Sequence, residues 1–177
     1  ITDAAFVGVN NYFEIFKDTT FVHALWYTAL FTIASVLTIN VIAFTVAMLL
    51  TKGIKGTNVF RTVFFMPNLI GGIVLGYIWQ LIFNGVLLYF NKTLTFSASY
   101  GFWGLVILIN WQQIGYMMII YIAGIQNIPT ELIEAAKIDG ANSTQVLRNV
   151  TLPMVMPSIT ICTFLTLTNS FKLFDQN

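Results

Sequence analysis

The chain has 177 residues, of which 57% are hydrophobic and 8% are charged, and its formal net charge at pH 7 is +1. An ordinary soluble domain has roughly 25% charged residues, so this composition excludes a compact soluble domain. The small net charge gives no reason to expect a nucleic-acid partner. Stretches of about 25 residues without a charge are long enough to cross ~30 Å of hydrocarbon as helices. The sequence therefore predicts an all-α, polytopic membrane protein.

Four membrane spans are predicted along the chain. The first runs from about Val22 to Leu50 and the second from about Phe60 to Phe83. The third runs from Tyr100 or Gly101 to Gln126, and the fourth from about Met154 to Phe171. Residues 1–21 are expected to form a short interfacial segment before the first span. Residues 85–99 are expected to form a mixed loop.

The basic residues of the short loops predict the orientation of the spans. Alternating spans place residues 51–61 and 127–153 on one side of the membrane, and these two segments contain five basic residues: Lys52, Lys55, Arg61, Lys137 and Arg148. The opposite side has three, which are Lys17, Lys92 and Lys172. Because basic residues are enriched on the inner side, both segments are expected to face the cytoplasm.

The residue types that the sequence lacks exclude some ways of driving transport and some kinds of catalysis. No acidic residue lies between Asp18 and Glu131, whereas proton-driven carriers usually place ionisable groups inside the membrane. Sodium coupling is less firmly excluded, because backbone carbonyls alone can hold Na⁺. The sequence also lacks the G-x-x-x-x-G-K-[ST] loop that cradles phosphates, and one histidine and one cysteine form no catalytic group. We therefore expect a transport protein rather than an enzyme, with any energy supplied by another subunit.

Residues 127–153 form a polar insert between the last two spans. Pro129 is expected to end the preceding helix, and residues 130–138 can form a short helix with acids in its first turns. Gly140 should break or turn the chain. Asn142 can cap a second helix, with Gln145 completing a capping box. An ordinary solvated loop is the alternative interpretation of this insert.

The stretch EAAKIDGANSTQVLRNVTLPMVMP resembles the EAA loop of the permease subunits of ABC importers. Leu147 departs mildly from the pattern, which usually has an aromatic residue there. GIQNIPTELIEAA, RTVFFMPNLIGGIVLGYIWQLIFN and FVGVNNYFEIF further resemble the carbohydrate branch, of the maltose and glycerol-phosphate permease type. The positions that match the EAA pattern are Glu134, Ala135, Ala136, Asp139, Gly140, Ala141, Leu152 and Pro153.

This resemblance implies a type I importer permease in a bacterial inner membrane. Residues 1–177 would form part of the transmembrane domain, and residues 127–153 its cytoplasmic coupling loop. Family members usually have six spans, so one span is expected to be missing at each end. The implied partners are a second permease subunit, a cytoplasmic ATPase dimer that binds ATP and Mg²⁺, an extracytoplasmic solute-binding protein, and membrane lipid. This chain itself would need no cofactor.

The solute would be a sugar or oligosaccharide, driven through the membrane by ATP. Alternatives are a permease for glycerol-phosphate, a polyol or another solute class, an energy-independent channel, or an interaction-only membrane protein. Which sugar is transported, and whether the two permeases are identical, are left open by the sequence.

Polar residues inside the predicted spans are the candidates for solute binding. Two neighbouring amides in a membrane helix are costly unless they face protein or water, and planar polar groups with aromatic faces suit sugars. Hydrogen bonding between helices is the alternative role for these amides. Trp79 is expected to lie in the aromatic belt at a membrane edge. The candidate solute residues are Gln112, Gln113 and Tyr116 in the third span, Asn68 and Gly72 in the second, and Ser170 in the fourth.

Overall fold

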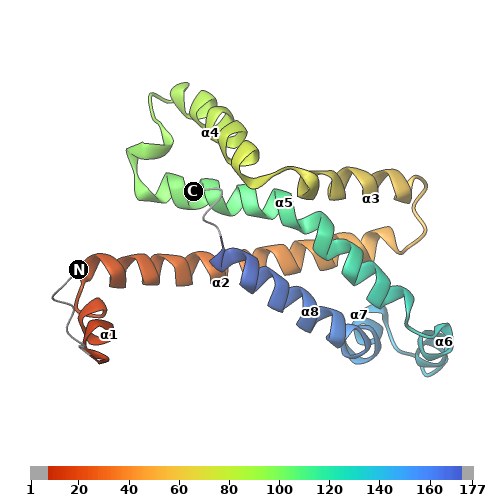
Figure 1. The fold of residues 1–177 in the computed structure, drawn as a ribbon. Helices are drawn as coiled ribbons and strands as arrows, with labels where there is room; N and C mark the ends of the chain where they lie inside the picture. Colours follow the sequence, from red (N-terminus) through yellow and green to blue (C-terminus); the bar gives the residue numbers. More distant parts are fainter. Residues whose placement is uncertain (1–7, 173–177) are drawn as a thin grey trace.

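The computed structural model of the chain describes residues 8–172, without the side chains of residues 10–12, and this part contains helices and no strand (Figure 1). The predicted all-α fold is confirmed. In chain order the elements are α1 (Asn10–Ile15), α2 (Thr19–Leu50), α3 (Thr57–Phe65), the 3₁₀ turn η1 (Met66–Leu69), α4 (Gly72–Leu88), the 3₁₀ turn η2 (Leu94–Phe96), α5 (Ala98–Gln126), α6 (Thr130–Ile138), α7 (Ser143–Val146), the π turn η3 (Leu147–Thr151) and α8 (Leu152–Phe171).

Three helical stretches of residues 8–172 are long and apolar enough to cross a membrane. They are Thr19–Leu50, Ala98–Gln126 and Ser143–Phe171, and they correspond to the first, third and fourth predicted spans. The third stretch joins α7, the π turn and α8 into one continuous rod. A fourth span exists only if the bent pair Thr57–Leu69 and Gly72–Leu88 is counted as one.

Helix α5 forms the centre of the fold. In its apolar stretch 61% of the residues are buried, against 28% for α2 and for the α7–α8 rod, so α5 is the helix that the others surround. Helices α2 and α8 pack against α5 and against each other. Cys162 is a free, buried thiol in this core. The core includes Phe31, Ile39, Ala43 and Ala47 of α2, Val106, Ile109, Met117 and Tyr121 of α5, and Val155 of α8.

Two glycines of α5 let neighbouring elements approach its backbone. A Cβ atom added at Gly115 would overlap the backbone carbonyl of Phe64, the penultimate residue of α3. A Cβ atom added at Gly124 would overlap the side chain of Ser158 in α8. Small residues at such crossings allow the close packing that stabilises helix pairs in membranes. The positions of α3 and α8 therefore both depend on glycines of α5.

The prediction of one continuous helix for the second span is wrong. The helix ends at η1, and α4 then leaves at an angle of 101° (Figure 1). Pro67 has no backbone N–H to continue the helical hydrogen bonds. Ile70 and Gly71 are extended, with ψ of 130° and 139°. The chain therefore turns between Leu69 and Gly72 and carries α4 away from the other helices.

Hydrogen bonds between side chains join the three central helices. The Tyr121 hydroxyl of α5 donates to Asn40 Oδ1 of α2 over 2.6 Å, and Asn40 Nδ2 donates to Thr166 Oγ1 of α8 over 2.9 Å. Elsewhere along α5, Asn110 Nδ2 donates to Thr38 Oγ1 of α2 over 2.9 Å. Such bonds contribute about 0.6 kcal/mol each on average between membrane helices. They fix which residues of the three helices lie side by side.

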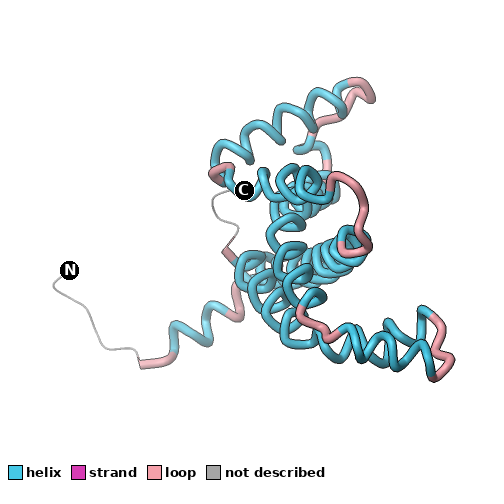
Figure 2. Tube along the Cα trace, turned by 90° about the vertical axis from the view of Figure 1, so that its right-hand side faces the viewer, coloured by secondary structure: helices cyan, strands magenta, loops and turns pink. Residues whose placement is uncertain are grey.

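The insert between α5 and α8 projects from one end of this bundle, and Figure 2 views the molecule from that end. A small cleft there is lined by Met48 near the end of α2 together with Lys137 and Ala141 of the insert. The loop at residues 51–56 follows α2 directly, so it lies at the same end as the insert. This agrees with the alternating spans, while the side of the membrane that this end faces stays a prediction.

Candidate functional site

The corner after α6 is closed by a Schellman motif. The N–H of Ala141 donates to the Ala136 carbonyl over 2.9 Å, and the N–H of Gly140 donates to the Lys137 carbonyl over 3.1 Å. Gly140 has a φ of +83°, a conformation that glycine adopts at little cost. These are the two hydrogen bonds that define the motif at a helix C-terminus. The predicted glycine corner is therefore confirmed.

A capping box starts the short helix that follows the corner. Asn142 Oδ1 accepts from the Gln145 N–H over 2.9 Å, and Gln145 Oε1 accepts from the Asn142 N–H over 2.8 Å. Both predicted members of the box are in place. The C-terminus of α6 and the N-terminus of α7 are thus both capped by hydrogen bonds within the insert, and no contact with the bundle is needed.

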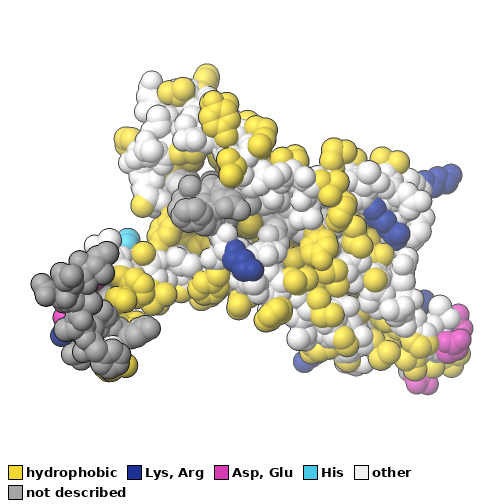
Figure 3. Space-filling view, viewed as in Figure 1, with side chains coloured by type: hydrophobic (Ala, Val, Ile, Leu, Met, Phe, Trp, Pro, Cys, Tyr) yellow, Lys and Arg dark blue, Asp and Glu magenta, His cyan; other side chains and the backbone are white. Residues whose placement is uncertain are grey.

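The surface of α6 is exposed and mixes acids with apolar side chains. Glu131 and Glu134 are exposed, and acidic side chains gather at this tip of the molecule (Figure 3). Leu132 is 44% exposed and Ile138 is 86% exposed. Ile138 follows Glu134 by four residues and so shares its face of the helix. Sequence reasoning missed Ile138, although an apolar residue beside the glycine corner was a usable signal.

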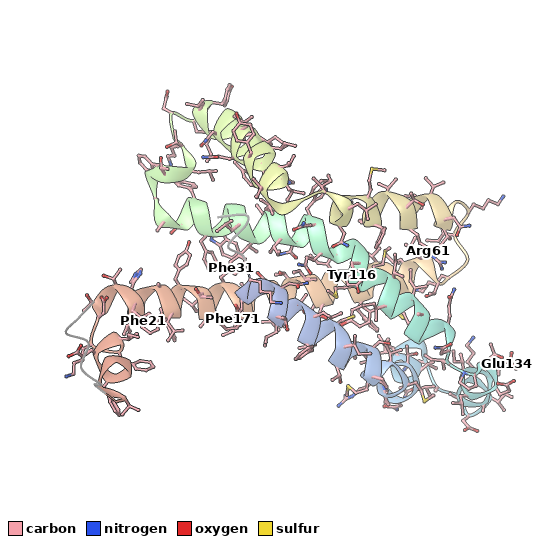
Figure 4. All side chains as sticks on the ribbon, viewed as in Figure 1. Phe21, Phe31, Arg61, Tyr116, Glu134 and Phe171 are labelled. Atoms are coloured by element: carbon pink, nitrogen blue, oxygen red, sulfur yellow. The ribbon has the colours of Figure 1, made fainter. Side chains whose placement is uncertain are left out.

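The matched motif positions fall into two groups in space. Those from Glu134 to Ala141 lie on α6 and its corner, far out on the insert (Figure 4). Leu152 and Pro153 instead begin α8, after the π turn. The Leu152 N–H donates to the Leu147 carbonyl, five residues back. Pro153 has no N–H and its ring crowds the carbonyl four residues before it, which disfavours a regular α-turn there.

The two neighbouring glutamines of α5 are buried and point to different neighbours. Gln112 Nε2 donates to the Ile70 carbonyl, in the extended break before α4, over 3.4 Å. Gln113 Oε1 accepts from Asn169 Nδ2 of α8 over 2.9 Å. Each amide therefore makes a hydrogen bond across helices. The pair connects α5 to the bend on one side and to α8 on the other.

The other candidate solute residues lie around these two amides. Tyr116 is 36% exposed in the middle of the bundle, with its ring 6.4 Å from that of Phe65 (Figure 4). Ser170, next to Asn169, is buried, and its hydroxyl has no hydrogen-bond partner among the described residues. Asn68 and Gly72, both predicted in the second span, lie in different elements, because the bend separates η1 from α4.

A cavity of about 380 Å³ lies between α4, η2 and the first half of α5. None of the six candidate solute residues lines it. The half-buried ring of Trp79, expected in the aromatic belt, lies 4.9 Å from Phe83 and 5.5 Å from Trp111 between ring centroids. Sequence reasoning missed this cavity because its walls come from separate helices. The lining residues are Ile73, Gly76, Tyr77, Trp79, Gln80 and Phe83 of α4, Leu94 of η2, and Gly101, Gly104, Leu105 and Leu108 of α5.

The fold and these sites define a multi-pass helical membrane protein with polar side chains between its spans and a locally capped helical insert at one end. The profile of one family, described as the binding-protein-dependent transport system inner membrane component, matches residues 39–176. The match covers more than half of the chain, and the chain therefore belongs to that family.

Similar proteins come from several organisms. The probable starch degradation products transport system permease protein AmyD of Thermoanaerobacterium thermosulfurigenes is 46% identical over 185 residues, which cover 100% of this chain and 63% of AmyD. The multiple sugar-binding transport system permease protein MsmF of Streptococcus mutans is 32% identical over 180 residues, which cover 97% of this chain and 62% of MsmF. The chain thus spans a little under two thirds of the length of these relatives.

A similar fold is found in a bacterial ABC transporter involved in the import of the acidic polysaccharide alginate. One of its chains matches with a TM-score of 0.79 and 18% identity, covering 96% of this chain and 64% of that chain. A second structure, of the alginate transporter in complex with an alginate pentasaccharide-bound periplasmic protein, matches with a TM-score of 0.75. At this identity the likeness shows the fold alone.

Proposed function

We propose that the chain is part of a permease subunit of an ATP-driven importer and forms a path for a sugar or oligosaccharide. The observation that carries this proposal is the insert, whose helices are capped by their own residues and exposed at one end of the bundle. Family membership supports the importer class. The relatives AmyD and MsmF, named for starch degradation products and multiple sugars, support the solute class.

The α6 corner is the proposed contact with a cytoplasmic ATPase. Glu134 is exposed and can pair with a basic group, while Ala135 leaves room for close approach. Ile138, exposed on the same face, can insert into an apolar groove of the partner. The ATPase dimer would bind ATP and Mg²⁺, and its closure would move the insert. Since α7, the π turn and α8 are continuous, that motion would reach α8 directly.

The buried amides of α5 are the proposed solute contacts. Gln112 and Gln113 each hydrogen-bond to a neighbouring element, namely the bend at Ile70 and helix α8. If α8 shifts with the insert, the Gln113–Asn169 bond opens and the two amides of that bond can bind sugar hydroxyls. Tyr116 offers an aromatic face one turn further along α5, and Ser170 a buried hydroxyl beside Asn169. Asn68 and Gly72 would line the same path at the bend.

The remaining subunits are proposed from the family and from its relatives. A second permease would complete the path, and an extracytoplasmic solute-binding protein would deliver the sugar. The alginate transporter was solved with such a periplasmic protein, which supports the second of these partners. The transporter would reside in the inner membrane with its apolar helix faces in contact with lipid.

Two variants of the insert test the coupling role in the full-length protein with all of its subunits. Glu134→Lys reverses a charge that the ATPase is proposed to contact, and Gly140→Pro forbids the φ of +83° at the corner. We expect both variants to stop uptake of a labelled maltooligosaccharide while the protein stays in the membrane. Affinity purification in mild detergent should recover the ATPase with the wild type and lose it with both variants.

Gly53→Pro is the matched control for Gly140→Pro. Gly53 also has a positive φ, +78°, and lies at the same end of the bundle, but outside the insert. The control should retain ATPase binding. Normal uptake by the Glu134→Lys and Gly140→Pro proteins would remove the insert from the mechanism. Transport that persists without any ATPase would identify the protein as a channel.

A further inference from the structure

The cavity between α4 and α5 has two contrasting walls. On α4 the lining residues recur at helical spacing, at 73, 76, 77, 80 and 83, so one face of this helix looks onto the cavity. That face presents the rings of Tyr77 and Phe83. On α5 the opposite wall includes Gly101 and Gly104. A Cβ atom added at Gly101 would meet no atom within 4 Å, so the space beside it is open.

The aromatic wall also carries polar groups that are free to bind a ligand. They are the Tyr77 hydroxyl, the Trp79 indole N–H and the Gln80 amide, and none of them makes a hydrogen bond within residues 8–172. A lipid acyl chain could use the rings but none of these groups. A sugar uses both, because its C–H face packs on a ring while its hydroxyls bond to an amide, a hydroxyl or an indole. The cavity volume also lies within the range of small-ligand sites.

The cavity lies one helical turn along α5 from the proposed solute contacts. Leu108 lines its inner end, and Gln112 follows one helical turn later on α5. Trp111 lies between them along α5, and its ring is in edge-to-face contact with Trp79 at 5.5 Å. The α5 wall, from Gly101 to Leu108, is about 10 Å long at 1.5 Å per residue. It lies toward the end of α5 remote from the insert, so a solute arriving from outside would meet the cavity before the amides.

We propose that this cavity is an outer carbohydrate subsite, which binds the part of an oligosaccharide that extends beyond the sugar rings held at Gln112 and Gln113. This inference rests on the proposed function and deepens it. A disaccharide would be held at the amides alone, whereas a longer chain would also place a ring against Tyr77 and Trp79. The cavity would therefore select for chain length, independently of the solute-binding protein.

Filling the cavity tests this subsite without removing any contact of the fold. Gly101→Leu adds a side chain where the structure has open space, so the protein should fold and insert normally. In the full transporter we expect the KM for uptake of labelled maltopentaose to rise about tenfold, the effect of losing about 1.4 kcal/mol of binding. The KM for maltose should change less than about twofold. Trp79→Ala should show the same difference between the two sugars.

Gly85→Leu is the matched control, because Gly85 lies on α4, has open space around it and does not line the cavity. It should leave the uptake of both sugars unchanged. An equal effect of Gly101→Leu on maltose and maltopentaose, or no effect on either, would overturn the subsite. In the second case, lipid lost from the purified Gly101→Leu protein but not from Gly85→Leu would assign the cavity to an acyl chain. A wild-type transporter that imports neither sugar would overturn the proposed solute class and, with it, this inference.

Discussion

Helix α5 and the α6–α7 insert are stabilised in opposite ways. Helix α5 is buried along most of its apolar stretch and is fixed by contacts with residues far away in the sequence, such as Phe64 at Gly115 and Asn169 at Gln113. The insert is exposed, and its corner and caps are made by residues three to five positions apart. A segment that folds by its own hydrogen bonds leaves its outer surface free to bind a partner.

This difference indicates how far the effect of a substitution should spread in each region. A substitution in α5 alters several elements at once, because α2, α3 and α8 all pack against it. A substitution on the insert should alter only the insert or its proposed contact with a partner. Three variants compare the two regions by the thermal unfolding of the purified protein in detergent, with hydrogen exchange added for the variant of the insert.

The largest effect is expected for Gly115→Val. Its side chain would overlap the Phe64 carbonyl, and a backbone atom cannot move aside as a flexible side chain can. Overpacking of this kind costs about 3 kcal/mol or more. The protein should unfold at a markedly lower temperature and accumulate poorly in the membrane. The same change at Gly85, which has open space around it, should have little effect, and equal behaviour of the two variants would show that α3 does not pack tightly on α5.

An intermediate effect is expected for Gln113→Leu. The variant keeps the volume of the side chain but removes the acceptor for Asn169 Nδ2, which costs about 1–2 kcal/mol. The double variant Gln113→Leu with Asn169→Leu should recover part of this loss, because no polar group is then left unpaired. If Gln113→Leu unfolds at the wild-type temperature, the hydrogen bond between α5 and α8 contributes nothing.

The smallest effect on unfolding is expected for Asn142→Ala. The lost N-cap costs about 1 kcal/mol, but only within the insert. The unfolding temperature of the bundle should therefore stay the same, while backbone amides of residues 143–146 exchange with solvent about fivefold faster. Asn149→Ala is the control, because Asn149 is exposed and its side chain makes no hydrogen bond within the described residues. A clear fall in the unfolding temperature of Asn142→Ala would contradict the local nature of the insert.

The same contrast explains what the sequence could predict. The helix at 130–138, the corner at Gly140 and the Asn142–Gln145 box depend on residues close together in the chain, so their spacing was sufficient. The three straight spans follow from the length of their apolar runs. The break at Ile70 was not predicted, although Pro67 and the glycines after it were visible. Whether such residues bend a membrane helix depends on whether neighbouring helices can hydrogen-bond to the backbone groups left unpaired at the bend. Here Gln112 of α5 donates to the Ile70 carbonyl.

The sequence predicted which residues are candidates for solute binding, but not which helices bring their side chains together. A buried amide in a span needs a hydrogen-bond partner, and Gln113 is paired with Asn169. No sequence pattern indicates which helix supplies that partner. The cavity was beyond sequence reasoning for a related reason. Trp79 and Gly101 line one space only because the chain returns from α4 through η2 to the start of α5. An aromatic residue near the end of a span reads as a membrane anchor until that geometry is known.

The π turn at Leu147–Thr151 has a consequence for the direction in which the insert points. Its hydrogen bond spans five residues instead of four, so the turn contains one residue more than an α-helical path would use. Each residue of an α-helix corresponds to a rotation of about 100° around the axis and a rise of 1.5 Å. The azimuth of α6 around the axis of α8 is therefore offset from that of an unbroken helix. A single residue in this turn therefore sets the direction in which Glu134 and Ile138 present the proposed contact surface of the insert.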